Sequence, residues 1–250
     1  MAAHCRAGRG RLSHFIARCH VAVSNAAMGI ASHQPASAGA TISRVLLLHG
    51  IWNARVWVEP LAWRLRAHGF DVDVFGYASV FGGPDVAVPS LVQRLRQSGP
   101  VALVGHSLGG LVALEALRQA PELPVPRVVC LGSPLLGSGT ARLLGERGWS
   151  VALGRSGGLL QQGLREWNGA AEVGLVAGTV PHGLGCLLGA IDHQSDGTVA
   201  LAETRLPGLR DHCVVSASHS GLVLSAEAAR QTAAFLRHGR FGADAPACAA

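Results

Sequence analysis

The sequence predicts an α/β fold with a mostly parallel central sheet, helices on both faces and a small cap insertion. From residue 44 onward, short apolar runs alternate with longer segments whose apolar residues recur at helical spacing. Such alternation is typical of a parallel sheet that helices cover on both faces. One serine with nearby glycines, Ser107, lies between a strand-like run and a helix-like segment, where a tight turn is expected. The length of 250 residues suits one domain with a large core.

The first half of the domain is expected to begin with a continuous apolar strand at 44–49. Residues 56–68 have apolar side chains at helical spacing and are followed by Gly69, which predicts a helix that ends there. Residues 70–75 alternate between apolar and polar and predict a second strand. A proline at the expected first turn places the next helix at 89–97.

The remaining elements follow the same alternation. They are a strand at 100–104, a helix at 111–117, strands at 127–131, 172–177 and 212–216, and a last helix at 225–238. The Gly- and Leu-rich segment 133–170 interrupts the pattern. We therefore expect this segment to form a cap over the carboxyl ends of the strands, within a domain that spans 41–240.

The composition excludes several classes of protein. Hydrophobic residues make up 49% of the chain and charged residues 14%, which is typical of a globular protein and not of a disordered one. No apolar run reaches the roughly 18 residues that a membrane span needs. The net charge of +6 comes without a nucleic-acid-binding motif, so no nucleic-acid partner is expected. We expect neither a metal nor another cofactor.

The first 40 residues are predicted to be a basic tail outside the fold, and residues 241–250 a C-terminal tail. No acidic residue precedes Glu59, whereas six arginines do. This composition is also typical of a transit segment, and Met28 is an alternative start. Six cysteines without a C-x-x-C pair predict free thiols in a reducing compartment, which indicates the cytoplasm.

The pentapeptide Gly105-His106-Ser107-Leu108-Gly109 carries the most specific chemistry in the chain. A G-x-S-x-G sequence between a strand and a helix forms a nucleophile elbow. This turn is so tight that the serine adopts strained backbone angles and the flanking positions must be glycine. Ser107 then lies at a helix N-terminus, whose dipole favours a nearby oxyanion. In a chain with 33 glycines the pentapeptide alone is a weak signal, so the serine needs partners in the right chain order.

A nucleophilic serine needs a base, and the base needs a carboxylate that orients it. After an elbow the expected order is serine, acid, histidine. Asp196 is the expected acid because it lies in an Asp-Gly turn after a strand-like segment; Asp192 is the alternative. His219 is the expected base because it follows the last strand, whereas His212 begins that strand and would lie at its wrong end. An Asp-Gly turn without any catalytic role is the competing interpretation of Asp196.

The transition state of acyl transfer carries an oxyanion that needs two N–H donors. Leu108, the residue after the serine, is expected to supply one of them. The loop after the first strand is expected to supply the other, since Gly50 lets the backbone turn so that the N–H of Ile51 points inward. Trp52 or Asn53 could supply this second donor instead.

Four stretches, taken in order, resemble the lipase-like branch of the α/β-hydrolases. They are residues 48–52, 105–110 and 131–138, and Asp196-Gly197-Thr198-Val199 with His219. The resemblance spans about residues 44–240, and it implies hydrolysis of a carboxylic ester. By this resemblance Ser107 attacks the carbonyl, His219 is the general base and Asp196 orients it. The third stretch has Leu135 where a histidine is common in the family, so no role of that histidine is carried over.

The implied substrate is a small acyl ester or a lipid. The expected substrate-binding residues are Trp52, His106, Leu135 and Leu136. The apolar cap suggests an acyl pocket, although packing of the cap onto the core explains its leucines equally well. The same three catalytic residues fit an acyltransferase or a thioesterase, and a catalytically silent binding module is the alternative from another class. The sequence leaves the oligomeric state open.

Overall fold

The computed structural model describes residues 42–187, 189 and 194–242. The tail expected at 1–40 and the alternative acid Asp192 lie outside these residues. Of the expected C-terminal tail, the structure describes Phe241 and Gly242. The ring of Phe241 lies 5.0 Å from that of Phe235, and its N–H donates to Asp211 at 2.7 Å. Phe241 therefore packs on the domain, one residue beyond the expected boundary.

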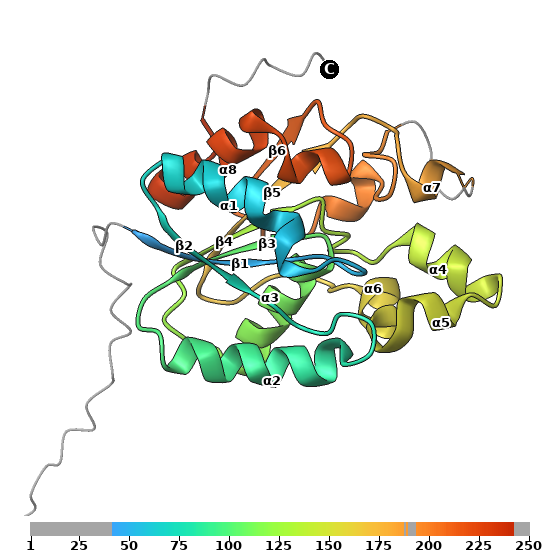
Figure 1. The fold of residues 1–250 in the computed structure, drawn as a ribbon, viewed down its shortest axis with the longest axis horizontal. Coiled ribbons are helices and arrows are strands. Elements are labelled where there is room, and N and C mark those ends of the chain that lie inside the picture. The colour runs from blue at the N-terminus through green and yellow to red at the C-terminus, as the bar shows by residue number, and fades with distance from the viewer. Residues whose placement is uncertain (1–41, 188, 190–193, 243–250) are drawn as a thin grey trace, which may run out of the picture. The chain divides into compact units, whose positions relative to one another are not determined.

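Six parallel strands form one sheet in the order β2-β1-β3-β4-β5-β6 (Figure 1). Their bounds are β1 (Arg44–Leu48), β2 (Asp71–Phe75), β3 (Ala102–His106), β4 (Arg127–Leu131), β5 (Glu172–Gly178) and β6 (Asp211–Val215). The expected strands are confirmed to within two residues at each end. The direction of winding reverses between β1 and β3, and the carboxyl ends of strands at such a switch point are where parallel sheets bind ligands.

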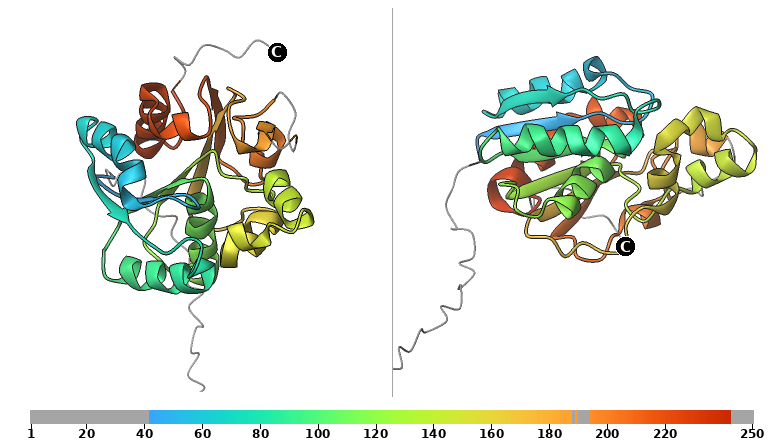
Figure 2. Two further views of the ribbon diagram at one scale, coloured as in Figure 1. Left: turned by 45° about the vertical axis from the view of Figure 1, so that its right-hand side comes forward. Right: turned by 90° about the horizontal axis from the view of Figure 1, so that it is seen from below.

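Helices cover both faces of the sheet, as predicted (Figures 1 and 2). On one face lie α1 (Glu59–Ala67), which follows the 3-10 turn η1 (Arg55–Val58), and α8 (Ala226–His238); on the other lie α2 (Gly83–Arg96) and α3 (Leu108–Gln119). The alternation of side chains along β1 explains the two layers, since Val45 and Leu47 pack with α1 and α8. Leu46 and Leu48 pack with α2 and α3 instead.

The helix expected at 89–97 was placed wrongly, because α2 begins six residues earlier. Pro84 and Asp85 occupy its first turn, and Pro89 lies inside it. A proline in that position removes one backbone hydrogen bond. The helix continues through it because its buried face is unbroken, formed by Ala87, Val88, Leu91, Val92 and Leu95. Tertiary packing therefore outweighs the local preference of Pro89.

Between β4 and β5 the chain forms α4 (Gly139–Glu146), α5 (Ser150–Leu153), the 3-10 turn η2 (Gly154–Ser156) and α6 (Gly157–Gln162). We call these residues the 139–162 segment. It lies beyond the carboxyl ends of the strands, at the right of Figure 1 and again in both views of Figure 2. The shorter elements that follow are α7 (Leu184–Leu187), η3 (Leu201–Thr204) and η4 (Ser220–Val223).

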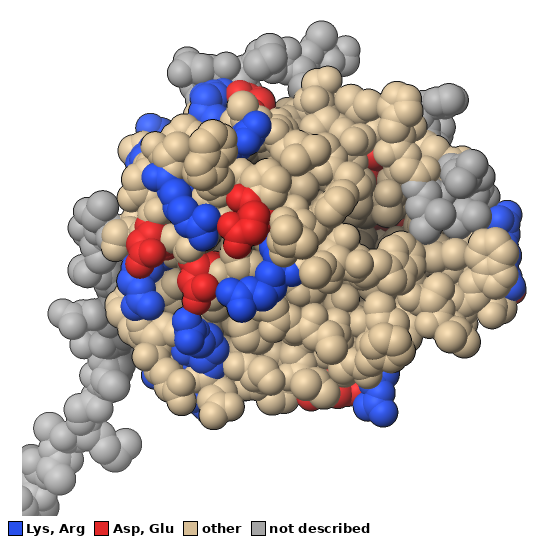
Figure 3. All heavy atoms as spheres, in the orientation of Figure 1, with Lys and Arg blue, Asp and Glu red and all other residues tan. Residues whose placement is uncertain are grey.

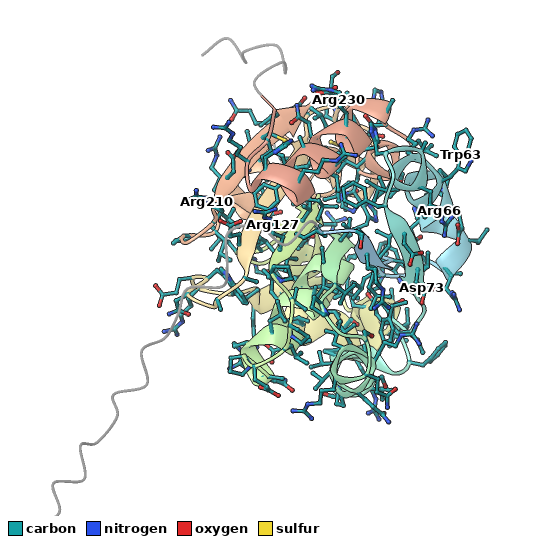
Figure 4. The ribbon with its side chains drawn as sticks, turned by 90° about the vertical axis from the view of Figure 1, so that its left-hand side faces the viewer. Trp63, Arg66, Asp73, Arg127, Arg210 and Arg230 are labelled. Carbon is teal, nitrogen blue, oxygen red and sulfur yellow. The ribbon has the colours of Figure 1, made fainter. Side chains whose placement is uncertain are left out.

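On the face seen in Figure 3, charged side chains are most frequent over the left half, and a smaller group lies at the right edge. Figure 4 views the charged end, where Asp73 pairs with Arg94 at 2.6 Å and Arg127 pairs with Glu172 at 2.8 Å. Among the described residues, none of the helices combines the length and the apolar character needed to cross a bilayer.

Candidate active site

Ser107 forms the turn between β3 and α3 in a strained conformation, with φ 55° and ψ −122°. Left-handed backbone angles cost a non-glycine residue about 1–3 kcal/mol and persist only where the surroundings impose them. One such restraint is the hydrogen bond from the Ser107 N–H to the carbonyl of Leu131 at 2.8 Å, which ties the turn to β4. The strain places the serine side chain at the N-terminus of α3.

The two glycines of the motif are required by close backbone contacts. A Cβ atom on Gly105 would lie 2.4 Å from the backbone nitrogen of Gly110. A Cβ atom on Gly109 would lie 2.6 Å from the carbonyl oxygen of Leu48 in β1. Neither position has room for a side chain, so the turn adopts the tight geometry that the sequence motif predicts.

Asp196 and His219, which are 23 residues apart in the chain, form a hydrogen-bonded pair. The distance between His219 Nδ1 and Asp196 Oδ2 is 2.7 Å, and the N–H of His219 also donates to the carbonyl of Asp196 at 2.8 Å. The N–H groups of Thr198 and Val199 donate to the other carboxylate oxygen at 3.0 and 2.8 Å. Since a carboxylate only accepts, Nδ1 of His219 carries the proton and Nε2 is left as the acceptor.

Gly132, which the sequence analysis did not single out as a site residue, joins this pair to the elbow. A Cβ atom on Gly132 would lie 3.0 Å from Asp196 Oδ2 and 3.1 Å from His219 Nδ1, and its φ is +55°. The preceding residue, Leu131, accepts the hydrogen bond from Ser107. Ser107 and the Asp196–His219 pair therefore both lie beside the turn that follows β4. The sequence offered one signal for this role, which is that Gly132 directly follows a buried strand.

His106 lies under the loop that carries His219. Its Nε2–H donates to the carbonyl of His219 at 3.0 Å, and the two rings are 4.9 Å apart. Burial, followed by repulsion from His219, lowers the pKa of His106 to about 3. His106 is thus neutral at ordinary pH and only 1% exposed. This placement favours a role in positioning His219 over the substrate contact expected from the sequence.

The loop after β1 lies directly against the elbow, because a Cβ atom on Gly50 would be 3.0 Å from Ser107 Cβ. His49 fixes this loop. Its Nε2 accepts the N–H of Tyr77 at 3.3 Å, so its Nδ1–H donates to the Gly50 carbonyl at 2.9 Å. The peptide that follows is planar and trans, so the N–H of Ile51 points opposite to this carbonyl. Burial lowers the pKa of His49, which keeps it neutral.

Tyr77 completes the support of this loop. Its O–H donates to the carbonyl of His49 at 2.7 Å, and the two rings stack 4.4 Å apart. Tyr77 is the only tyrosine in the sequence. Its role could not be predicted from the sequence, because nothing in the local pattern links the loop after β2 to the end of β1.

The other residues predicted to bind the oxyanion or the substrate differ in their exposure and contacts. The N–H of Leu108 is the first of α3, where a helix leaves its amide groups without a carbonyl partner. Trp52 is 51% exposed and donates its indole N–H to the Ala152 carbonyl in the 139–162 segment at 2.6 Å. Leu135 is fully buried in the core, which favours packing over substrate contact, whereas Leu136 is 37% exposed.

His212 lies at the amino end of β6 and contacts Thr204 Oγ1 at 2.9 Å through Nε2. It therefore faces away from the elbow, as its position in the sequence indicates. Within the described ranges, no group of three or more metal-ligating side chains comes together.

No family model matches the sequence. A pimeloyl-[acyl-carrier protein] methyl ester esterase of Aliivibrio salmonicida is 32% identical over 114 residues, which cover 43% of this chain and 40% of that relative. The chain thus matches less than half the length of this curated relative.

Two solved structures share the fold. The Bacillus licheniformis lipase BlEst2, in its propeptide form, aligns with a TM-score of 0.68 at 20% identity, covering 87% of this chain and 54% of that one. The metagenomic carboxyl esterase MGS0156 aligns with a TM-score of 0.54 at 19% identity, covering 75% of this chain and 68% of that one. At this level of identity the likeness establishes the arrangement of strands and helices.

Proposed function

We propose that this chain, a member of the α/β-hydrolase superfamily, hydrolyses carboxylic esters through an acyl-enzyme on Ser107. The observation that carries the proposal is the 2.7 Å pair of His219 and Asp196, held at the same turn as the strained elbow. A serine at a helix N-terminus, a histidine whose Nε2 is the acceptor and a buried orienting carboxylate are the parts that acyl transfer needs. The curated relative is itself named an ester hydrolase.

In the first half of the reaction, Ser107 Oγ bonds to the ester carbonyl carbon while its proton passes to His219 Nε2. The bond from that carbon to the alcohol oxygen then breaks, and the alcohol leaves with the proton. Asp196 accepts the Nδ1–H throughout and stabilises the imidazolium that forms. The N–H groups of Leu108 and Ile51 are the proposed donors to the oxyanion, with the α3 dipole behind them.

In the second half, water attacks the acyl-enzyme. His219 Nε2 takes one proton of the water as the oxygen bonds to the carbonyl carbon. The tetrahedral species then collapses, the acid is released and the proton returns to Ser107 Oγ. The fixed tautomer of His219 lets the same nitrogen act as base and then as acid in each half.

An apolar acyl ester is the proposed class of substrate. The elements beside the site expose large apolar side chains, among them Trp52 (51% exposed), Trp149 (53%) and Val151 (88%). Methyl esters of apolar acids are the first natural-type substrates to test, because the curated relative is named a methyl ester esterase.

The test is hydrolysis of p-nitrophenyl and methyl esters of rising chain length by the purified protein. The variants are Ser107→Ala and, as a matched control, Ser90→Ala. Ser90 is an exposed residue of α2. We expect wild type and Ser90→Ala to hydrolyse at least one ester, and Ser107→Ala to lose about 10⁵-fold or more in kcat. Ester hydrolysis that survives in Ser107→Ala would overturn the proposal, as would a folded wild type that hydrolyses none of the series.

A further inference from the structure

Asn53 lies near the end of the loop that follows β1, and its side chain folds back over Gly50 toward Ser107. A Cβ atom placed on Gly50 would lie 3.3 Å from Asn53 Nδ2 and 3.0 Å from Ser107 Cβ. The amide nitrogen and the serine therefore border the same small space. Asn53 is half-buried, so its amide is within reach of a ligand at Ser107.

The backbone just before Asn53 is strained. Trp52 has φ 59°, and among the described residues only Ser107 shares a positive φ without being glycine. Such a conformation costs about 1–3 kcal/mol. The indole bond of Trp52 to Ala152 holds the turn from outside. Of these two strained residues, one directly precedes Asn53 and the other is Ser107 itself, which indicates that the position of Asn53 serves the site.

His106 shows which end of the Asn53 amide faces this space. Because its Nε2–H donates to His219, its Nδ1 bears a lone pair, and among the described residues this buried atom has no hydrogen-bond partner. The same point beside Gly50 lies 3.3 Å from His106 Nδ1. An amide nitrogen is favoured over an amide oxygen opposite a lone pair. Asn53 therefore presents N–H groups, and not its oxygen, beside Ser107.

We propose that Asn53 is a catalytic residue whose Nδ2–H donates to the oxyanion that forms on Ser107. The proposal rests on the ester hydrolysis proposed above and adds a side-chain donor to the backbone donors of Leu108 and Ile51. The Asn53 amide lies beside Gly50, on the side of Ser107 where the loop after β1 is expected to supply the second oxyanion donor. Because the carbonyl oxygen carries a full negative charge only in the tetrahedral species, the bond accelerates the reaction more than it tightens substrate binding.

The test compares wild type with Asn53→Leu, which keeps the shape of the side chain but has no donor, and with Asn53→Asp, which replaces the donor by an acceptor. Asn168→Leu is the matched control. Asn168 is exposed, its amide donates to Glu166, and both residues are distant from Asn53 in the sequence. Ester hydrolysis gives kcat and KM, an alkylboronic acid that mimics the tetrahedral species gives an inhibition constant, and thermal melting gives stability.

Both Asn53 variants are expected to lose about 100-fold or more in kcat with KM within about threefold of wild type. The boronic acid should bind more weakly by the same factor, while Asn168→Leu matches wild type. The proposal is overturned if Asn53→Leu and Asn53→Asp keep more than about a third of wild-type kcat, or if KM and the melting temperature change and boronate binding does not. If wild type and Asn168→Leu are both inactive and do not bind the boronic acid, the ester hydrolysis itself is wrong and the role of Asn53 falls with it.

Discussion

Asp196 and His219 are joined twice, by Oδ2 to Nδ1 at 2.7 Å between side chains and by N–H to carbonyl at 2.8 Å between backbones. The backbone bond holds the loop of His219 against the loop of Asp196. The two side chains are therefore kept within hydrogen-bond distance of each other. Burial shields the pair from water, since the Asp196 side chain is 2% exposed and that of His219 is 12% exposed. A polar pair of this kind stabilises one tautomer of the histidine.

The first prediction concerns the choice of acid. Asp196→Asn keeps the shape of the side chain but offers an amide that can donate to His219 and stabilise the wrong tautomer. We expect kcat for ester hydrolysis to fall by about 10⁴-fold. Asp192→Asn, the alternative from the sequence, should retain activity. A harmless Asp196→Asn together with an inactive Asp192→Asn would show that the acid is assigned wrongly.

The second prediction concerns Gly132. In Gly132→Ala the new methyl group would lie 2.7 Å from Leu222 Cδ1, 3.0 Å from Asp196 Oδ2 and 3.1 Å from His219 Nδ1, so Leu222 and the pair must shift and activity should fall at least tenfold. Gly99→Ala is the matched control, because Gly99 also has a positive φ but nothing lies within 4 Å of its Cβ position. Both variants should lose about 1–2 kcal/mol of stability from backbone strain, and Gly132→Ala should lose more because its methyl group also crowds Leu222. Equal activity in the two variants would contradict the placement of Gly132.

The third prediction concerns acid stability. Burial lowers the pKa of His106 to about 3 and, with Arg205 adding repulsion, that of His212 to about 4; His49 is shifted in the same direction. The unfolded chain binds these protons near pH 6.5, so the stability they contribute is present above pH 6.5 and is lost as pH falls toward 4. The slope is at most about 1.4 kcal/mol per pH unit for each histidine.

Thermal melting between pH 7 and pH 4.5 measures this slope. His212→Gln, far from Ser107, should flatten the dependence of the melting temperature on pH while leaving ester hydrolysis intact. An unchanged slope in His212→Gln would show that His212 is not held neutral in the folded protein.

The fourth prediction uses the single tyrosine. Burial raises the pKa of Tyr77 well above its ordinary value. Absorbance at 295 nm should therefore show no tyrosinate up to about pH 11 in the folded protein, and ionisation near pH 10 in urea. Tyr77→Phe should lower kcat, since the His49 carbonyl loses its hydrogen-bond donor and the Gly50 loop loosens. Ionisation near pH 10 without unfolding would mean that Tyr77 is not buried against His49.

The strands were predictable because each is a short apolar run, and the helical spacing of Leu61 and Leu65 was enough to place α1. The start of α2 was not predictable, because a proline is common in the first turn of a helix and Pro89 therefore resembles a helix start. Only the packing of Ala87 and Val88 shows that the helix begins earlier. The roles of Ser107, Asp196 and His219 stay predictions; their chain order could be proposed from the sequence because the three residues follow β3, β5 and β6, which lie in that order in the sheet. Contacts between distant loops, such as Gly132 with His219 and Tyr77 with His49, depend on the assembled fold and have no local pattern.

The most direct test of the account is the reaction of the folded protein with a fluorophosphonate, followed by mass spectrometry of the labelled peptide. An activated serine predicts one adduct, on Ser107, that is absent in Ser107→Ala and slowed at least 100-fold in His219→Gln, with Ser90→Ala labelled like wild type. A folded protein that takes no label, or that takes it on another serine, would contradict the central claim that Ser107, His219 and Asp196 act together as a nucleophile, base and orienting acid.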